Sequence, residues 1–189
     1  MHNGCMGFPC ATVTLLFTDV EGSIRLWEAD REATAEASAR HNSMVCELIE
    51  VVGGHVFQAV GEAFRAVFAG PSAAPAAAVV AIQRTAGTEP WPLGLPIRVR
   101  TALDPGASLK RVRDYFGPVV NRVARLLAVG HGSQVLVTGA TCELLAGRLP
   151  GGIRFRDLGE YRLKDLGPAE RVFEITGPGL TGGSVRCAR

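Results

Sequence analysis

The stretch Leu15-Leu16-Phe17-Thr18-Asp19-Val20-Glu21-Gly22-Ser23 decides how the rest of this chain is organised. It begins as an apolar run and reaches a carboxylate, Asp19, before a glycine-containing turn leads into a predicted helix. A strand that ends in an acidic side chain, with backbone amides just beyond, can hold a hard cation and the phosphates that accompany it. The same aspartate could equally cap the next helix, which is the commoner role at such a position.

Length, composition and charge limit the class of protein. The 189 residues are 47% hydrophobic, enough for one soluble domain with a full core. The net charge of +2 comes from 20 basic and 18 acidic residues mixed along the chain, which argues against a surface dedicated to nucleic acid. Because we find neither a run of about 18 apolar residues nor a signal peptide, we expect no membrane contact and a cytoplasmic location.

Hydrophobic periodicity predicts an α+β fold, a mainly antiparallel sheet with helices packed on it. We expect a folded domain over 12–176, a flexible lead over 1–11 and a flexible tail over 177–189. One long helix is expected from Ser23 to Val52, and the turn residues Asp104-Pro105-Gly106 are expected to end a strand at Leu103. Further helices are expected at 71–85, from 118 to about 129, and at 141–149. Strands are expected at 12–17, 55–60, 64–68, 97–103, 134–138, 155–163 and 170–176.

Four more polar residues join Asp19 as candidates for chemistry. Glu62 lies at the tip of a predicted hairpin, Asp114 precedes a glycine turn, and Asn121 and Arg125 are four residues apart on one helix face. Carboxylates from neighbouring strands commonly hold paired divalent ions for phosphoryl transfer, and an arginine then neutralises charge in the transition state. Taken singly, each residue also has an ordinary interpretation as a turn residue, a helix cap or a solvated face.

Four motifs, in this order, resemble the class III nucleotide cyclase catalytic domain. They are Phe-Thr-Asp-Val-Glu-Gly-Ser at 17–23, Gly-Glu-Ala-Phe at 61–64, Asp-Tyr-Phe-Gly at 114–117 and Asn-Arg-Val-Ala-Arg-Leu at 121–126. The resemblance runs from about residue 12 to residue 176. It implies a ferredoxin-like βαββαβ palm that works as a head-to-tail homodimer, with ATP sites at the interface that draw residues from both subunits.

The resemblance also implies a metal site. Asp19 and Glu62 stand where the family has its two metal-binding carboxylates, and the carbonyl of Val20 would be a further ligand. The ions would be two Mg²⁺ or Mn²⁺ ions per site. In the family they activate the ribose 3′ hydroxyl of ATP for attack on the α-phosphorus, which yields 3′,5′-cyclic AMP and pyrophosphate.

The remaining site residues are assigned by the same resemblance. Gln58 and Asp114 occupy the positions that contact the adenine base. Asn121 matches the asparagine that orients the ribose, and Arg125 matches the arginine that stabilises the transition state.

Several positions depart from the pattern of the family. Glu62 replaces an aspartate and so carries one more methylene, and Gln58 replaces the lysine that reads the base. Ala102, Asp104 and Ala107 replace the usual glycine, histidine and glutamate near the dimerisation arm. Because a shift near 1 Å can cost on the order of a hundredfold in rate, we expect a weakened cyclase. We also expect it to prefer Mn²⁺, which tolerates distorted oxygen geometry.

Two other functions are compatible with the same residues. The chain could be an inactive pseudo-cyclase that binds nucleotide or a partner without turnover. It could also be a dimerisation module whose nucleotide site is vestigial. The native partner could be a second copy, or a different cyclase domain that supplies a lysine and an aspartate where this chain has Gln58 and Glu62.

Overall fold

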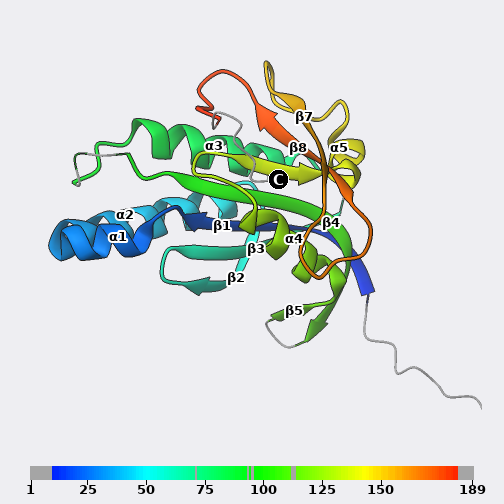
Figure 1. The fold of residues 1–189 in the computed structure, drawn as a ribbon, viewed down its shortest axis with the longest axis horizontal. Helices are drawn as coiled ribbons and strands as arrows, with labels where there is room; N and C mark the ends of the chain where they lie inside the picture. The colour runs from blue at the N-terminus through cyan, green and yellow to red at the C-terminus, as the bar shows by residue number, and fades with distance from the viewer. Residues whose placement is uncertain (1–9, 71, 93, 95, 112–113, 183–189) are drawn as a thin grey trace, which may run out of the picture.

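The computed structural model describes residues 10–70, 72–92, 94, 96–111 and 114–182. In this part the strands form one sheet in the order β2-β3-β1-β4-β6-β8-β7, with β5 paired to β4 (Figure 1). The strands are β1 (Cys10–Val20), β2 (His55–Val60), β3 (Ala63–Ala69), β4 (Val99–Arg111), β5 (Asp114–Phe116), β6 (Val135–Thr138), β7 (Arg154–Tyr161) and β8 (Glu170–Thr176). The helices are α1 (Ser23–Ala29), α2 (Arg31–Glu50), α3 (Ala74–Thr88), α4 (Pro118–Ala128) and α5 (Gly139–Leu145).

The first half of the chain follows the predicted βαββαβ order. After β1, the helices α1 and α2 lead to the hairpin β2–β3, and α3 then leads to β4. These four strands lie in the order β2-β3-β1-β4 and pair antiparallel, and the later pair β4–β6 is parallel. The predicted α+β class and the ferredoxin-like palm are therefore confirmed.

Strand β1 separates two apolar clusters because successive side chains point to opposite faces of the sheet. Leu16 and Val20 lie in the cluster with α2 and α3, whereas Leu15 and Phe17 lie in the cluster with α4. Figure 1 shows the same layers, with α4 in front of the sheet and α2 and α3 behind it. Asp19 has the same parity as Leu15 and Phe17, so it belongs to the face of the sheet that α4 partly covers.

The prediction of one long helix from Ser23 to Val52 is wrong in one respect, because the structure has two helices separated at Asp30. Asp30 has an extended backbone (φ −154°, ψ 103°), and its carboxylate caps α2 by accepting the Ala33 N–H at 3.0 Å. The hydroxyl of Thr34 donates to the carbonyl of Leu26 at 2.9 Å, which ties α1 to α2. Because the whole stretch has a helical composition, the sequence did not reveal that Asp30 is a helix cap.

The break predicted at Asp104-Pro105-Gly106 is also wrong, because β4 continues through these residues to Arg111. The pairing of β4 with β6 ends at Leu103, and the pairing with β1 continues. A proline is tolerated in a strand where one edge has no partner to receive an N–H. The turn signal in the sequence is therefore overridden by the pairing with β1.

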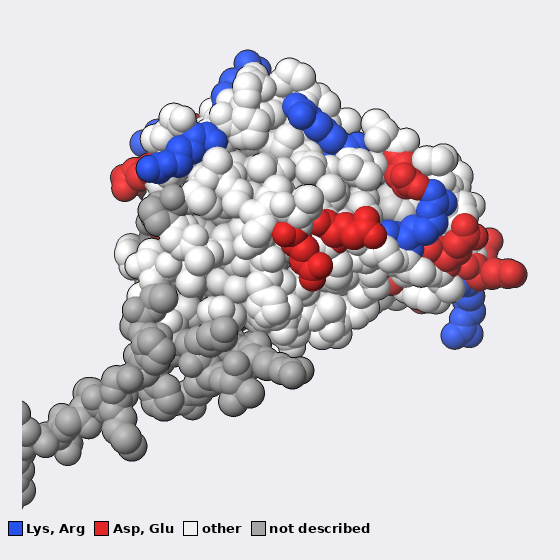
Figure 2. Space-filling view, turned by 180° about the vertical axis from the view of Figure 1, so that it is seen from behind, with Lys and Arg blue, Asp and Glu red and all other residues white. Residues whose placement is uncertain are grey.

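Three further observations bear on the expectations about charge, membrane contact and the tail. Figure 2 shows the side opposite to Figure 1, where the described basic and acidic side chains lie scattered and form no continuous basic patch. Among the described helices, none has the length and apolarity that crossing a membrane requires. Residues 177–182, which the sequence assigns to the tail, contact the core: Leu180 packs against it, and Arg84 donates two hydrogen bonds to the carbonyl of Pro178.

Candidate active site

Asp19 is the penultimate residue of β1, directly opposite Arg100 of β4. The Arg100 guanidinium donates to one carboxylate oxygen, Oδ2, from Nε at 2.9 Å and from Nη2 as well. The two side chains are 25% and 30% exposed, so both can be reached by a ligand. Asp19 does not cap α1, whose N-cap residue is Gly22, and the capping alternative is therefore excluded.

Glu62 lies in the turn between β2 and β3, and two helices hold its carboxylate. Oxygen Oε1 accepts hydrogen bonds from the indole Nε1 of Trp27 in α1 at 2.9 Å and from the hydroxyl of Ser38 in α2 at 2.5 Å. Burial raises the pKa of Glu62, but the hydrogen bonds from Ser38, Trp27 and the backbone outweigh it, so the pKa is lowered. Glu62 is therefore a carboxylate at neutral pH.

A fully buried histidine, His41 of α2, lies close enough to both carboxylates to be affected by their charges. Burial lowers the pKa of His41, against the opposing influence of Asn42, Glu62 and Asp19. The centre of its ring lies 5.9 Å from that of the Phe64 ring, and the amide oxygen of Asn42 accepts a hydrogen bond from Nδ1 of His41 at 3.1 Å. The lowered pKa favours the neutral form of His41 next to the Glu62 carboxylate.

The donor atoms at this end of β1 fit a hard divalent cation. Asp19 and Glu62 offer carboxylate oxygens, and Val20, whose side chain is buried, could offer only its backbone carbonyl. The described residues contain no group of three or more His, Cys, Asp or Glu side chains placed to hold a metal. A set made only of oxygen atoms suits a hard divalent cation better than zinc, which proteins hold mainly with Cys and His.

Gln58 of β2 lies opposite Arg65 of β3, on the same sheet face as Phe17. Its carbonyl oxygen Oε1 accepts a hydrogen bond from Nη1 of Arg65 at 2.7 Å. The Arg65 guanidinium lies 5.1 Å from the centre of the Phe17 ring, a cation–π contact that helps to hold it. The side chain of Asp114, the other residue predicted to contact the base, lies outside the described residues.

Asn121 and Arg125 project from α4 on the side away from the sheet. Val119, Val123 and Leu126 are the buried residues of this helix, whereas Asn121 is exposed. Arg125 donates to Asp165, in the connection between β7 and β8, at 3.0 Å. Within the described residues no hydrogen bond or ion pair joins Asn121 or Arg125 to Asp19 or Glu62. In one copy of the chain the two sets of predicted site residues therefore have different partners, Arg100 for Asp19 and Asp165 for Arg125.

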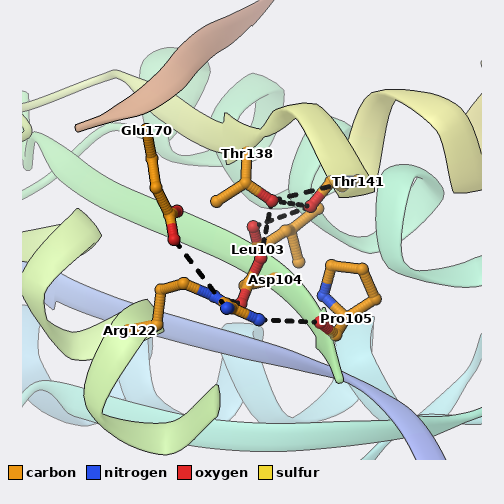
Figure 3. Close-up of polar contacts among 7 residues, drawn as sticks. All are labelled: Leu103, Asp104, Pro105, Arg122, Thr138, Thr141 and Glu170. Atoms are coloured by element: carbon orange, nitrogen blue, oxygen red, sulfur yellow. Dashed lines mark hydrogen bonds and ion pairs between the residues drawn. The ribbon is translucent and has the colours of Figure 1, made fainter. Parts of the chain in front are cut away.

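Helix α4 is attached to the sheet by a buried ion pair that the sequence did not suggest (Figure 3). Asp104 of β4 is fully buried and accepts from Arg122 Nε at 2.5 Å and from the Thr138 hydroxyl at 2.6 Å. Arg122 also donates to the carbonyl of Pro105 at 3.4 Å and lies 3.8 Å from Glu170. Burial raises the pKa of Asp104, against the lowering influence of Thr138 and Arg122. The pair fixes the helix between Asn121 and Arg125.

Four residues that shape this site were not predicted from the sequence. Arg100 and Arg122 could be found only from the strand register and from helix docking, because neither lies next to its aspartate in the chain. Ser38 is one of a series of small polar residues four apart in α2, which is a usable signal in retrospect. Trp27 looked like part of an apolar stripe.

Comparison with known proteins supports the assignment of the fold and identifies the family. Residues 8–176 match the adenylate and guanylate cyclase catalytic domain. The adenylate cyclases of Trypanosoma brucei, solved in their monomeric state, superpose with a TM-score of 0.82 at 23% identity over 92% of both chains. The adenylyl cyclase CyaB from P. aeruginosa superposes with a TM-score of 0.77 at 20% identity, over 96% of this chain and 98% of that one. At these identities the structures show a common fold.

Relatives by sequence point the same way. An uncharacterized protein of Mycobacterium tuberculosis is 38% identical over 174 residues, which cover 91% of this chain and 58% of that protein. The chain thus spans little more than half the length of this relative. The adenylate cyclase of Schizosaccharomyces pombe is 27% identical over 167 residues, covering 72% of this chain and 10% of that enzyme. On the family match over 8–176, this chain belongs to the adenylate and guanylate cyclase catalytic domain family.

Proposed function

We propose that this domain is an adenylate cyclase of low activity, which converts ATP into 3′,5′-cyclic AMP and pyrophosphate at an interface between two copies of the chain. The observation that carries the proposal is the division of the site residues into two groups. Asp19, Glu62 and Arg100 lie around the end of β1, whereas Asn121 and Arg125 point outward from α4. A second copy that brings its α4 to the first copy's β1 would complete the site.

The chemistry of each group matches one part of the reaction. Divalent ions held by Asp19, Glu62 and the Val20 carbonyl would activate the 3′ hydroxyl and neutralise triphosphate charge. Arg100, already beside Asp19, offers guanidinium donors to phosphate oxygens that approach the same carboxylate. From the second copy, Asn121 would orient the ribose and Arg125 would neutralise the charge that builds up on the phosphate in the transition state.

The orientation of Gln58 favours adenine over guanine. Because a guanidinium can only donate, the bond from Arg65 occupies the carbonyl end of the Gln58 amide and leaves the NH₂ end to face a ligand. Adenine accepts a hydrogen bond at N1, whereas guanine carries a proton there. Arg65 thus restores part of the base selection lost with the family's lysine, and we expect Arg65→Met to lower the ratio of product from ATP to product from GTP.

A mixing experiment tests the shared site. We expect Asp19→Ala and Arg125→Ala proteins each to be inactive alone, and their mixture to recover about a quarter of wild-type activity, since half of the dimers are mixed and each has one intact site of two. Cyclic AMP would be measured with ATP in Mg²⁺ and in Mn²⁺. Activity that persists in both single variants would contradict the proposal, and two inactive proteins that do not complement would contradict the shared site.

A catalytically inactive module that binds nucleotide or only dimerises is the second candidate. It is favoured by Glu62, which replaces an aspartate and is already engaged by Trp27 and Ser38. A nucleotide-binding module predicts that calorimetry detects ATP binding, and a pure dimerisation module predicts that it does not. In both cases no product should form after long incubation. A mixed dimer with a different cyclase domain would then show activity only when that partner is added.

A further inference from the structure

One side of α2 carries three small polar residues spaced four apart: Thr34, Ser38 and Asn42. The first makes a hydrogen bond to α1, and the other two make hydrogen bonds to the β2–β3 turn. Thr34 donates to the Leu26 carbonyl at 2.9 Å, Ser38 to Glu62 at 2.5 Å, and Asn42 to the Gly61 carbonyl at 3.1 Å. Because residues four apart lie in one row along a helix, α2 holds both α1 and the β2–β3 turn along a single line.

Trp27 completes this arrangement from α1. Its indole N–H donates to the same Glu62 oxygen as Ser38, at 2.9 Å, so two donors from two helices meet at one carboxylate atom. Asn42 at the same time fixes the backbone of Gly61, the residue before Glu62. A glutamate in a hairpin turn ordinarily samples many rotamers, and these contacts restrict it to one.

We propose that Trp27 and Ser38 are positioning residues that hold the Glu62 carboxylate in a single orientation for a divalent ion. The inference rests on the proposed function, since it takes Glu62 to be a metal ligand. The extra methylene of Glu62 adds a rotatable bond that ion binding would otherwise have to freeze. Hydrogen bonds from outside the ligand set remove that cost in advance, as they do for other metal-binding carboxylates.

The same geometry makes Trp27 a reporter of the ion. An ion bound by Glu62 withdraws electron density from the oxygen that the indole contacts, and a paramagnetic ion such as Mn²⁺ quenches a nearby indole. The chain has two tryptophans, and Trp91 is buried elsewhere with its N–H bonded to the Ala86 carbonyl at 2.9 Å. In a Trp91→Phe protein, the emission therefore reports on Trp27 alone.

The test is a titration of the full chain with MnCl₂ alone, followed by Trp27 fluorescence in the Trp91→Phe protein and by the electron paramagnetic resonance signal of free Mn²⁺ in all variants. We expect saturable quenching that Glu62→Gln removes. Ser38→Ala and Trp27→Phe should each weaken Mn²⁺ binding by about 10-fold or more, the usual cost of losing an outer-shell partner. Ser38→Thr, which keeps the hydroxyl, should bind as wild type does.

Matched controls separate positioning from general damage. Ser43→Ala removes an exposed serine from the same helix, and Trp91→Phe removes the other tryptophan, so both should leave Mn²⁺ binding unchanged. Circular dichroism melting confirms that each variant is folded. In a Glu62→Asp background, where the shorter side chain cannot reach both donors, Ser38→Ala should have little further effect on binding.

The outcomes are distinct from those of the mixing experiment. Mn²⁺ binding that depends on Glu62 but is unchanged in Ser38→Ala and Trp27→Phe would overturn the inference and leave the proposed function standing. Wild-type protein that binds no Mn²⁺, or binds it equally well with Glu62→Gln, would also overturn the inference, and cyclic nucleotide formation would then decide the proposed function independently.

Discussion

Strand β4 takes part in two aspartate–arginine pairs that differ in burial. Near its start, Arg100 pairs with Asp19 across the sheet, and both side chains are partly exposed, at 30% and 25%. Four residues further on, Asp104 is completely buried and pairs with Arg122 of α4. Strand parity places both pairs on the same face of the sheet. The two arginines are similarly exposed, at 30% for Arg100 and 31% for Arg122, so the burial of the carboxylate is the main difference between the pairs.

The difference in burial separates a pair that can open from a pair that must stay closed. Within the described residues Asp19 has no hydrogen-bond partner besides Arg100, and because both side chains are partly exposed, this pair can open to solvent. The Asp104 pair is enclosed by Thr138, the Pro105 carbonyl and Glu170, and it cannot open without exposing an uncompensated charge to the core. The same two residue types thus form a pair that can open at the end of β1 and a pair that fixes α4 to the sheet.

The largest expected effect comes from breaking the buried pair on one side. Arg122→Met leaves the Asp104 carboxylate buried without its guanidinium, and we expect the free energy of unfolding to fall by about 3–5 kcal/mol. Urea denaturation followed by circular dichroism measures it. The double variant Asp104→Leu, Arg122→Met removes both charges and should recover most of that loss. A loss below about 1 kcal/mol in the single variant would mean that this pair behaves like a surface one.

A smaller loss of stability is expected from crowding the contact between α4 and β4, next to the Asp104–Arg122 pair. A Cβ added at Gly106 would lie 2.8 Å from Cβ and 2.9 Å from Cγ2 of Val119, so Gly106→Ala must push the helix away. Overpacking of this kind costs about 1–3 kcal/mol. Gly87→Ala, inside α3 with nothing within 4 Å of the added carbon, is the matched control and should be neutral or stabilising. Equal effects at both glycines would refute close docking of α4 at this point.

The exposed pair should matter little to stability. We expect Arg100→Met to change the free energy of unfolding by no more than about 1 kcal/mol, because solvent already screens both groups. In 1 M salt, where the screening length is about 3 Å, the difference from wild type should shrink further. The same salt should leave the loss in Arg122→Met nearly unchanged. A loss in Arg100→Met as large as that in Arg122→Met would erase the distinction between the two pairs.

Local sequence was sufficient for most of the fold. The apolar run at 15–17, the glycine pair after Val52 and the hairpin at 61–63 produced the right order of elements, because each signal acts within a few residues. The two failures, at Asp30 and at Asp104-Pro105-Gly106, have one cause. At Asp30 the carboxylate caps α2 and the Thr34 hydroxyl bonds back to Leu26, and at 104–106 the pairing with β1 continues the strand, so in both places a specific hydrogen bond outweighs the composition of the stretch.

The residues of the candidate site likewise fall into those that local sequence identifies and those that depend on tertiary contacts. Asp19, Glu62, Asn121 and Arg125 could be picked out because they lie in short motifs. Their supports could not, since Arg100 depends on strand register and Arg122 on how α4 docks. Trp27 and Ser38 meet Glu62 only after α1 and α2 fold onto the hairpin. Short motifs in the sequence thus identify the candidate site residues, and the tertiary structure identifies the residues that contact and orient them.

The smallest expected effect is a difference in pH dependence that reports the burial of Asp104 itself. Its pKa is raised by burial, so the folded protein binds the proton more tightly than the unfolded chain, whose aspartates titrate near about 3.9. Stability from this group is present below that pH and is lost as the pH rises through the folded pKa. The stability of wild type relative to Asp104→Asn should therefore decrease as the pH rises from about 4.

Glu62 provides the comparison with the opposite sign. Its pKa is lowered in the folded protein, because the hydrogen bonds from Ser38 and Trp27 outweigh burial. Its contribution is therefore present above the unfolded pKa, near about 4.3, and is lost as the pH falls. Relative to Glu62→Gln, wild type should become more stable as the pH rises over the same acid range. Urea denaturation of the three proteins at a series of pH values gives both slopes, and a rising slope for Asp104 would mean that the hydrogen bonds from Thr138 and Arg122 outweigh burial.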